Sequence, residues 1–338
     1  MGHYDVHSNM FVVLVSPPGK SRKSTALRIG KSLLKSLADY GQEVHFSTQA
    51  SSVAALVQQL ASMKNSPHQS LSAYSSELGT LLGSKSVEMV DFLVDIYDCD
   101  PDWDKQTVGR GLDKIKLPWF NLMAATTPQW MGDNLSKTAV EGGFVSRTVF
   151  VFDDTRLLVA FPKLTPEQLK LKKYLAHDLA RICQLEGRFT LSPEAEAFYA
   201  QWYESPARLE RVSSDYRISG YFERKHVHVL KVAMALSLAA KDELILQPEE
   251  IGAAISLLDS IEPGMAKAFA AVGKNIHGTT MGRIEDQVRL ARVIPYKRVL
   301  AANIHDVQKE DLDKLLQALH DMGRIVWRND KIYHPDAV

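Results

Sequence analysis

The sequence is poor in cysteine and has no surplus of charge of either sign, and each absence excludes a class of protein. Only Cys99 and Cys183 occur in 338 residues, without a CxxC or Cys/His pattern, which argues against a zinc module and a disulfide framework. Lysine and arginine number 40 together, as do aspartate and glutamate, so no global positive field indicates nucleic acid binding. A reducing, cytoplasmic setting fits this composition best.

Long apolar runs are also missing. No stretch approaches the roughly 20 apolar residues that cross a bilayer, and residues 1–7 lack the basic region and apolar core of an export signal. We therefore expect a cytoplasmic protein with no membrane partner. An apolar share of 45% and a charged share of 24% are those of an ordinary globular protein.

The amino-terminal half alternates strand patterns with helix patterns. Residues 10–15 form an apolar run typical of a strand buried on both faces, and a helix pattern follows over 26–37. Further strands are expected at 43–46, 71–75, 119–125, 147–153 and 157–161, and further helices at 53–60, 78–97 and 129–137. The strand at 157–161 is expected at an antiparallel edge. The alternation predicts an α/β fold with a mostly parallel sheet.

From Thr165 onward, longer helix patterns replace the strands. They cover 166–185, 193–203, 221–241 and 248–272, and the glycine-containing segment 273–282 is the expected linker. Beyond it, helix patterns at 284–294, 296–302 and 309–322 precede a hairpin over 323–333 with Asn329-Asp330 as its turn. This order predicts a winged helix-turn-helix. We expect three domains, at 1–164, 165–282 and 283–338.

The turn after the first strand has the residue types that hold nucleotide phosphates. A Walker A loop needs a backbone that curls around phosphates, a lysine for the β and γ groups and a hydroxyl for Mg²⁺. Lys23 and Ser24 occupy the last two places, although Pro17 and Arg22 stand where the GxxxxGK[ST] pattern has glycines. The flanking strand and helix favour the phosphate loop over a merely basic turn. The residues assigned to it are Pro18, Gly19, Lys20, Ser21, Arg22, Lys23, Ser24 and Thr25.

Two acids compete for the role of organising the metal and activating water. Glu77 follows the third strand, where such ATPases place the Walker B acid, but Ser76 precedes it where an aspartate is usual. Asp153 ends a more apolar strand than Glu77 does. That strand, however, comes after the sensor strand, whereas the Walker B strand normally precedes the sensor strand. Chain order therefore favours Glu77, with a carboxylate at a helix amino end as its structural alternative.

The order of these motifs resembles that of helicase-like ATPases of bacteriophages and mobile elements. These proteins are often found with primases and are related to AAA+ and superfamily 3 replicative helicases. The resemblance covers about residues 10–270, and its motifs are the phosphate loop, Ser76-Glu77-Leu78-Gly79, Ala125-Thr126-Thr127-Pro128, Gly142-Gly143-Phe144-Val145-Ser146-Arg147 and Glu223-Arg224-Lys225. It implies a RecA/AAA+-like P-loop core at 1–164 that uses ATP and Mg²⁺, the metal being oriented by Ser24 and Ser76.

The resemblance also assigns three further residues. Thr127, or its neighbour Thr126, becomes a sensor of the γ-phosphate, with a helix cap as the alternative. Arg147 becomes an arginine finger that acts on a neighbouring subunit's nucleotide, which implies a ring, most often a hexamer. Its alternative is a surface charge at a strand start. Arg224 becomes a second sensor that reaches the phosphates, or else lies on a solvated helix face.

Two segments are possible contacts for DNA. The charged segment 105–116, which contains Arg110, is expected to be a flexible loop or to line a ring pore. The expected recognition helix at 309–322 is acidic and is not expected to read sequence. The basic and aromatic residues of the hairpin could instead contact backbone or a single strand, or serve only structure or protein docking. They are Arg324, Trp327, Arg328 and Lys331.

The sequence thus predicts an oligomeric, ATP-driven DNA helicase or translocase in phage or mobile-element replication. It is expected to bind DNA, preferably single-stranded and without sequence preference, and to work with a primase as a partner or as part of a longer primase-helicase. One alternative is a nucleotide-binding scaffold that recruits replication proteins without hydrolysis. A second is a small-molecule P-loop kinase, which would be a monomer unaffected by DNA.

Overall fold

The computed structural model describes residues 5–337 apart from short gaps, which are 49–50, 64–67, 84–85, 108–110, 136–138, 140–141, 157, 159–162, 207, 209–214, 273–275, 305–306 and 308. The chain divides into two compact units, Met1–Val272 and Gly273–Val338, each with its own hydrophobic core. The division into three domains stays a prediction. In the described residues, no helix is both long enough and apolar enough to cross a membrane.

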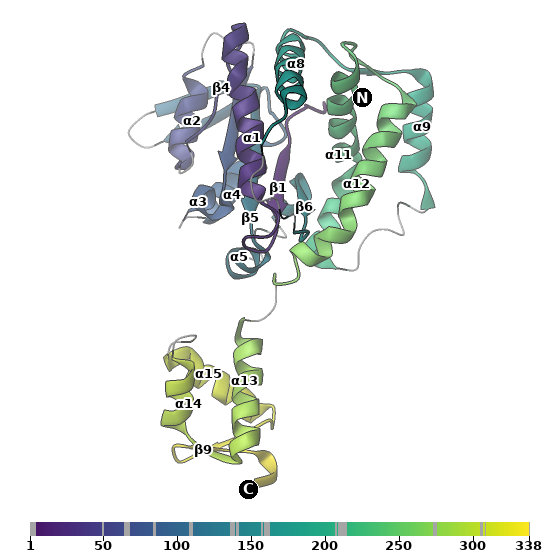
Figure 1. Cartoon of the computed structure of the whole chain (residues 1–338). Helices are drawn as coiled ribbons and strands as arrows, with labels where there is room; N and C mark the ends of the chain where they lie inside the picture. The colour runs from purple at the N-terminus through teal and green to yellow at the C-terminus, as the bar shows by residue number, and fades with distance from the viewer. Residues whose placement is uncertain are drawn as a thin grey trace. The chain divides into compact units, whose positions relative to one another are not determined.

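A parallel sheet lies at the centre of the first unit (Figure 1). Its order is β2-β5-β1-β6, where β1 is Phe11–Val15, β2 Gln69–Ser75, β5 Pro118–Thr126 and β6 Thr148–Phe152. All three pairings are parallel, because helical crossovers return the chain to the same edge. The sheet confirms the predicted α/β fold, and β1 is an inner strand between β5 and β6.

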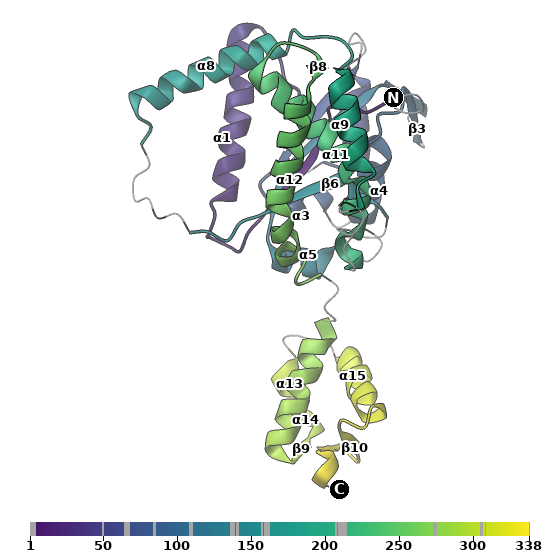
Figure 2. The same ribbon diagram turned by 90° about the vertical axis from the view of Figure 1, so that its right-hand side faces the viewer.

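Helices cover this sheet and its β6 edge. They are α1 Lys23–Lys35, η1 Ser36–Tyr40, α2 Val53–Ala61, α3 Leu78–Leu82, α4 Ser86–Ile96, α5 Pro128–Asn134, α7 Phe144–Arg147, α8 Pro166–Ile182, α9 Pro193–Tyr203, α11 Tyr216–Ala240 and α12 Pro248–Ala268. The long helices α11 and α12 pack side by side against β6 (Figure 2). The short strands β7 Thr190–Leu191 and β8 Ile245–Leu246 form a separate parallel pair.

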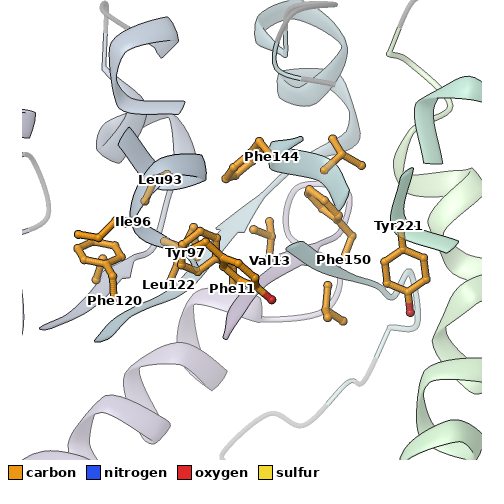
Figure 3. Packing of buried hydrophobic residues seen from close by; sticks show 14 of the residues in the cluster. Phe11, Val13, Leu93, Ile96, Tyr97, Phe120, Leu122, Phe144, Phe150 and Tyr221 are labelled. Atoms are coloured by element: carbon orange, nitrogen blue, oxygen red, sulfur yellow. The ribbon is translucent and has the colours of Figure 1, made fainter. Parts of the chain in front are cut away.

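Alternate residues of the central strands form the core. Phe11 and Val13 of β1, Phe120 and Leu122 of β5 and Phe150 of β6 are at most 1% exposed (Figure 3). Burying a side chain of this size contributes on the order of 2 kcal/mol. The core therefore fixes the strands' register, and with it the positions of the loops at both edges of the sheet.

Three local expectations are wrong. Residues 43–46 form only one parallel bridge, Phe46 to Ser72. The helix expected over 78–97 is broken at Gly83, whose φ is 63°. The described residues of the segment 105–116 are no flexible loop, because they belong to a hairpin of β3 Asp102–Thr107 and β4 Gly111–Lys116.

Opposite charges face each other across that hairpin, with Asp102 opposite Lys116 and Asp104 opposite Lys114. Such pairs stabilise antiparallel strands. Arg110, and most of the strand expected at 157–161, lie outside the described residues.

The second unit contains three helices and a three-stranded antiparallel sheet. The helices are α13 Ile276–Ala291, α14 Tyr296–Asn303 and α15 Lys309–Asp321; the strands are β9 Val293–Pro295, β10 Val326–Arg328 and β11 Lys331–Tyr333, in the order β10-β11-β9. A short turn of helix, η2 Pro335–Ala337, follows. The expected hairpin turn is confirmed, since Asn329 and Asp330 have φ angles of 47° and 59°. The linker is shorter than predicted, because α13 already begins at Ile276.

Candidate nucleotide-binding site

The loop between β1 and α1 has the backbone of a tight, left-handed turn at two positions. Gly19 has a φ of 72°, and Arg22, the residue before the helix, has φ 52° and ψ 32°. A residue with a Cβ is disfavoured in this region by roughly 1 kcal/mol. The structure thus explains why the generic pattern has a glycine where this chain has Arg22.

Lys23 closes the loop. Its Nζ donates a hydrogen bond to the main-chain oxygen of Ser16 at 3.1 Å, so the lysine reaches from the first turn of α1 back to the end of β1. No side chain caps α1, and no acidic residue lies in its first turn. The amino end of the helix therefore keeps its positive dipole for an anion.

The remaining loop residues surround this bond. Pro18, Gly19, Lys20, Arg22 and Ser24 are exposed, while Ser21 and Thr25 are half-buried. The Lys20 amide donates to the Pro17 oxygen at 3.4 Å. The Ser24 hydroxyl lies one residue beyond Lys23 on an exposed surface, where a metal ion and its water could be reached.

The register of the sheet brings the other candidate residues to the same edge. Val15, the last residue of β1, is level with Thr126 of β5 and with Phe152 of β6. Ser75 of β2 is level with Ala124, so the extended Glu77, two residues on, follows at the height of Thr126. The phosphate loop, the two threonines and Glu77 therefore lie at the carboxyl ends of three neighbouring strands, the usual ligand edge of such a sheet.

Glu77 is exposed and is the residue before α3, yet its side chain makes no cap hydrogen bond. In the described part of the chain it has no ion pair. The structural alternative of a capping carboxylate is thus not what the geometry shows. Ser76, beside it, is half-buried. At about 4.8 Å per strand, Glu77 lies roughly 10 Å from the β1 axis, with the end of β5 between them.

The two threonines differ. The Thr127 side chain accepts the Trp130 amide at 3.1 Å as the cap of α5, which is the alternative role that we named for it. Thr126 is fully buried, and its hydroxyl has no partner among the described residues. The ends of β2 and β5 are closely packed here, since a Cβ on Gly79 would lie 2.6 Å from Nε1 of Trp130.

Asp153 also lies at this edge, where its amide donates to the Val15 oxygen at 3.1 Å. Its carboxylate is bound to Thr155, both through the amide at 2.9 Å and through the hydroxyl. These hydrogen bonds hold the pKa of Asp153 below its ordinary value. Both acids thus remain candidates by position, but only Glu77 has a carboxylate without a protein partner in the part of the chain described.

Arg147 lies at the opposite edge of the sheet. It ends α7, directly before β6, and Thr148 is level with Phe11 at the start of β1. The five residues of β1 span about 16 Å, so Arg147 cannot serve the phosphate loop of its own chain. Gly143 makes room for it, because a Cβ there would lie 2.6 Å from Nη1 of Arg147.

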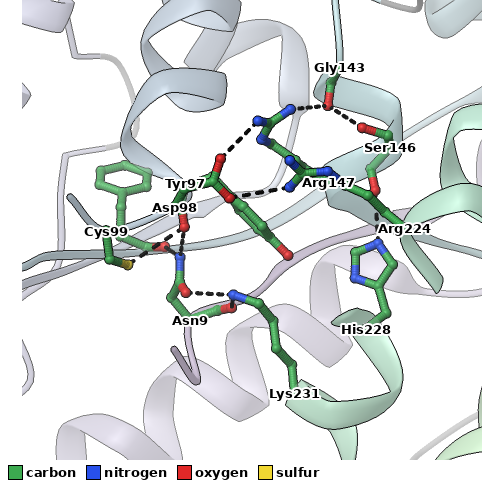
Figure 4. A network of polar contacts seen from close by, with 11 residues as sticks. Asn9, Tyr97, Asp98, Cys99, Gly143, Ser146, Arg147, Arg224, His228 and Lys231 are labelled. Carbon is green, nitrogen blue, oxygen red and sulfur yellow. Dashed lines mark hydrogen bonds and ion pairs between the residues drawn. The ribbon is translucent and has the colours of Figure 1, made fainter. Parts of the chain in front are cut away.

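Arg224 lies beside Arg147, at the edge remote from its own chain's phosphate loop, so its role as a second sensor stays a prediction. Asp98 binds both guanidinium groups, Arg147 at 2.9 Å and Arg224 at 3.2 Å (Figure 4). Burial would raise the pKa of Asp98, but the hydrogen bond and charge of Arg147 and the charge of Arg224 outweigh it and lower that pKa. The neighbouring Lys225 is instead buried between Asp259 and Glu262 of α12.

Further polar residues surround these arginines in a cluster that the sequence analysis did not predict. Lys231 is buried, donates to the oxygen of Asn9 at 2.8 Å and to its Oδ1 at 2.7 Å, and lies over the Tyr97 ring. Burial lowers its pKa to about 8. His228 Nε2 donates to the oxygen of Ser146 at 2.9 Å, and burial lowers its pKa to about 4. The only sequence signal was a run of polar residues at helical spacing in an otherwise apolar helix.

The donor set at the phosphate edge fits a metal held mainly by a nucleotide. No group of three or more His, Cys, Asp or Glu side chains within the described residues could hold a metal ion. Mg²⁺ at nucleotide sites typically takes one or two protein ligands plus phosphates and water. Ser24 with Ser76 or Glu77 would supply such ligands.

Comparisons with known proteins give distant structural likenesses. No protein-family model and no curated protein matches the sequence. The fold is similar to a full-length MCM homolog from Methanopyrus kandleri, at 14% identity and a TM-score of 0.41, over 77% of this chain and 53% of that one. It is also similar to the ORC2 protein of Aeropyrum pernix, at 13% identity and a TM-score of 0.23, over 97% and 85%. The chain spans about half the length of the MCM homolog, and TM-scores below 0.5 assign it no function.

Proposed function

We propose that the chain is an ATP hydrolase of the AAA+ type that acts as an oligomeric DNA helicase or translocase. One observation carries the proposal: Lys23 and the carboxylate of Glu77, which has no partner among the described residues, lie at the same edge of a parallel sheet. Between them lies β5, whose last residue, Thr126, is followed by Thr127. This order of groups suits a triphosphate whose γ-phosphate extends from the loop toward an acid.

In this proposal each group has one role. Lys23 exchanges its bond to Ser16 for the β- and γ-phosphates, and the free amides at the start of α1 bind the same anion. Ser24 and Ser76 would hold Mg²⁺, which would supply positive charge beside the phosphates. Glu77 accepts the proton of the attacking water, and a threonine at the end of β5 senses the γ-phosphate.

Arg147 acts in a neighbouring subunit. It lies at the edge remote from its own phosphate loop. A head-to-tail contact between copies would bring this edge, and with it Arg147, to the next chain's triphosphate. Repetition of such a contact closes a ring, for which a hexamer is our proposal.

The finer proposals rest on the resemblance of the motifs and on the second unit. Its helix and strand order suits a winged helix, and single-stranded DNA bound without sequence preference suits a translocase. A role in phage or mobile-element replication, beside or within a primase-helicase, is the biological setting that we propose.

The direct test measures binding of a fluorescent ATP analogue and DNA-stimulated ATP hydrolysis. Lys23→Ala should lose at least tenfold in affinity and all stimulated turnover. Lys35→Ala, which removes an exposed cation from the last turn of the same helix, should change neither. If wild type binds no better than Lys23→Ala, the site is misplaced.

A mixing experiment tests the role of Arg147. Lys23→Ala and Arg147→Ala chains should each be inactive, but a mixture should regain part of the wild-type rate, because some interfaces combine an intact loop with an intact arginine. A mixture as inactive as its components would contradict a shared site.

A nucleotide-binding scaffold without turnover is the second candidate. The left-handed Arg22 and the serine at position 76 favour it, since both depart from the residues that hydrolysing loops use. It predicts tight, Lys23-dependent binding of the ATP analogue with no hydrolysis, with or without DNA.

A further inference from the structure

In the second unit, exposed cations gather where the small sheet meets α14. Lys297 and Arg298 lie in the first turn of α14, and Arg328 and Lys331 flank the hairpin turn. None of the four forms an ion pair with any described residue. By contrast, Arg324, which the sequence analysis named together with Arg328 and Lys331, is bound to Glu285 at 3.2 Å.

The strand register places Arg328 and Lys331 side by side, and Lys297 and Arg298 come two and three residues after Pro295, in the first turn of α14. Arg328 is opposite Lys331, and Lys331 is opposite Pro295, the residue before α14. In the next row, Ile332 is opposite Ile294, and both are buried. Because neighbouring rows of a sheet point to opposite faces, Arg328 and Lys331 point away from the core, on the same face as Tyr333.

Aromatic packing holds α14 and the hairpin in place. The rings of Tyr296 and Trp327 stack with centroids 5.8 Å apart and planes 8° apart, and the Tyr296 amide donates to the Asp330 oxygen at 2.8 Å. Lys297 therefore follows a residue that is anchored to the hairpin. Tyr333 adds a half-buried ring on the outer face, of the kind on which bases can stack.

Helix α15 has the opposite character. It carries Glu310, Asp311, Asp313 and Asp321 against Lys309 and Lys314, and Lys314 is already bound to Asp311 at 3.0 Å. A surface of this charge would repel phosphates in a groove. The exposed acids that follow these residues in the chain are Asp330, in the turn, and Asp336, after Tyr333, so the four cations outnumber the acids on this part of the unit.

We propose that Lys297, Arg298, Arg328, Lys331 and Tyr333 form a basic sheet face that binds the backbone of single-stranded DNA, while α15 stays outside the grooves. The proposal deepens the proposed function, on which it rests for DNA as the partner. Contacts made by such cations are to phosphates and carry no sequence information. Bases that lie on Tyr333 add stacking, which every base can provide.

The test measures binding of the full chain to a fluorescent oligothymidine without nucleotide, over a range of salt concentrations. The triple variant Lys297→Glu/Arg328→Glu/Lys331→Glu should bind at least tenfold more weakly. The slope of log affinity against log salt should become shallower by about 2, because each of the three lost phosphate contacts contributes ~0.7 to it. A matched variant, Arg289→Glu/Lys309→Glu/Lys314→Glu, changes the charge equally on α13 and α15 and should stay within about threefold of wild type.

Equal losses in both triple variants would overturn the proposal, as would an unaffected sheet-face variant. Wild type that does not bind the oligonucleotide would overturn it too and would favour an acidic protein surface. If circular dichroism shows that the triple variant is unfolded, the neutral Arg328→Gln/Lys331→Gln variant replaces it, and a loss of DNA affinity is expected for that variant too. ATP hydrolysis without DNA is measured for each variant as well. A variant that has lost DNA binding but still hydrolyses ATP at the wild-type rate has an intact nucleotide site.

Discussion

Asp98 accepts a hydrogen bond from Arg147 at 2.9 Å across 49 residues of sequence, and its second oxygen accepts one from Arg224. One carboxylate thus holds two arginines together at the edge that we propose to face a neighbouring subunit, and it balances only one of their two positive charges. A triphosphate arriving there would compete with Asp98 for both guanidinium groups.

The Asp98→Asn variant should unfold at a slightly lower temperature at pH 7. The side chain is 57% exposed, so we expect only about 0.2–1 kcal/mol. The pKa of Asp98 is lower in the fold than in the unfolded chain, so its contribution is present above the unfolded value of about 3.9 and is lost as pH falls through the lower folded value. The difference from wild type in thermal unfolding should therefore shrink toward pH 2–3.

His228 should make the first unit sensitive to mild acid. Its pKa is about 4 in the fold against an ordinary 6.5, so the unfolded chain binds the extra proton first and stability falls as pH drops from about 6.5 toward 4. Between pH 7.5 and 5 this group alone should cost about 2 kcal/mol. His228→Gln, whose amide can still donate to Ser146, should lose less stability over that range. Denaturant unfolding of both proteins at pH 7.5 and pH 5 measures this loss. Equal losses of unfolding free energy in wild type and His228→Gln would contradict the role of His228.

Gly143→Ala should displace Arg147. The substitution combines a φ of 94° with a Cβ that would lie 2.6 Å from Nη1 of Arg147, so we expect a loss of about 1–3 kcal/mol in unfolding free energy and weaker ATP turnover. Gly41→Ala is the control, because Gly41 has a φ of 73° with no atom within 4 Å of the added Cβ. It should destabilise by backbone strain alone and leave turnover intact. Similar turnover in the two variants would count against Arg147 as a catalytic group.

Glu77→Gln should abolish turnover but not nucleotide binding. Removing a general base typically costs 10²–10⁴-fold in rate, and the amide leaves the shape of the site unchanged. Asp153→Asn should cost much less, because Asp153 is already bound to Thr155. The rates of single-turnover ATP hydrolysis of the two variants are compared. A larger loss of rate in Asp153→Asn than in Glu77→Gln would make Asp153 the catalytic carboxylate.

The phosphate loop could be placed from the sequence because its signal is local: an apolar strand, a short turn with lysine and hydroxyl, and an amphipathic helix. The position of Arg224 could not, because it depends on which edge of the sheet α11 approaches, and Asp98 lies 126 residues away from it. The hairpin at 102–116 was missed although it had a signal, the alternation of Asp102 and Asp104 with Trp103 against Lys114 and Lys116 with Ile115. A segment in which charged residues alternate with only a few apolar ones has the composition of a solvated loop. It can be identified as a strand only when its partner strand is known.

The close approach of Trp130 to Gly79 has a mechanical consequence. With no room for even a methyl group between the indole and the backbone, α5 and α3 cannot come closer together than they are. In the function that we propose, a movement of α5 toward α3 on engaging a nucleotide would therefore push α3, and with it Glu77, in the same direction.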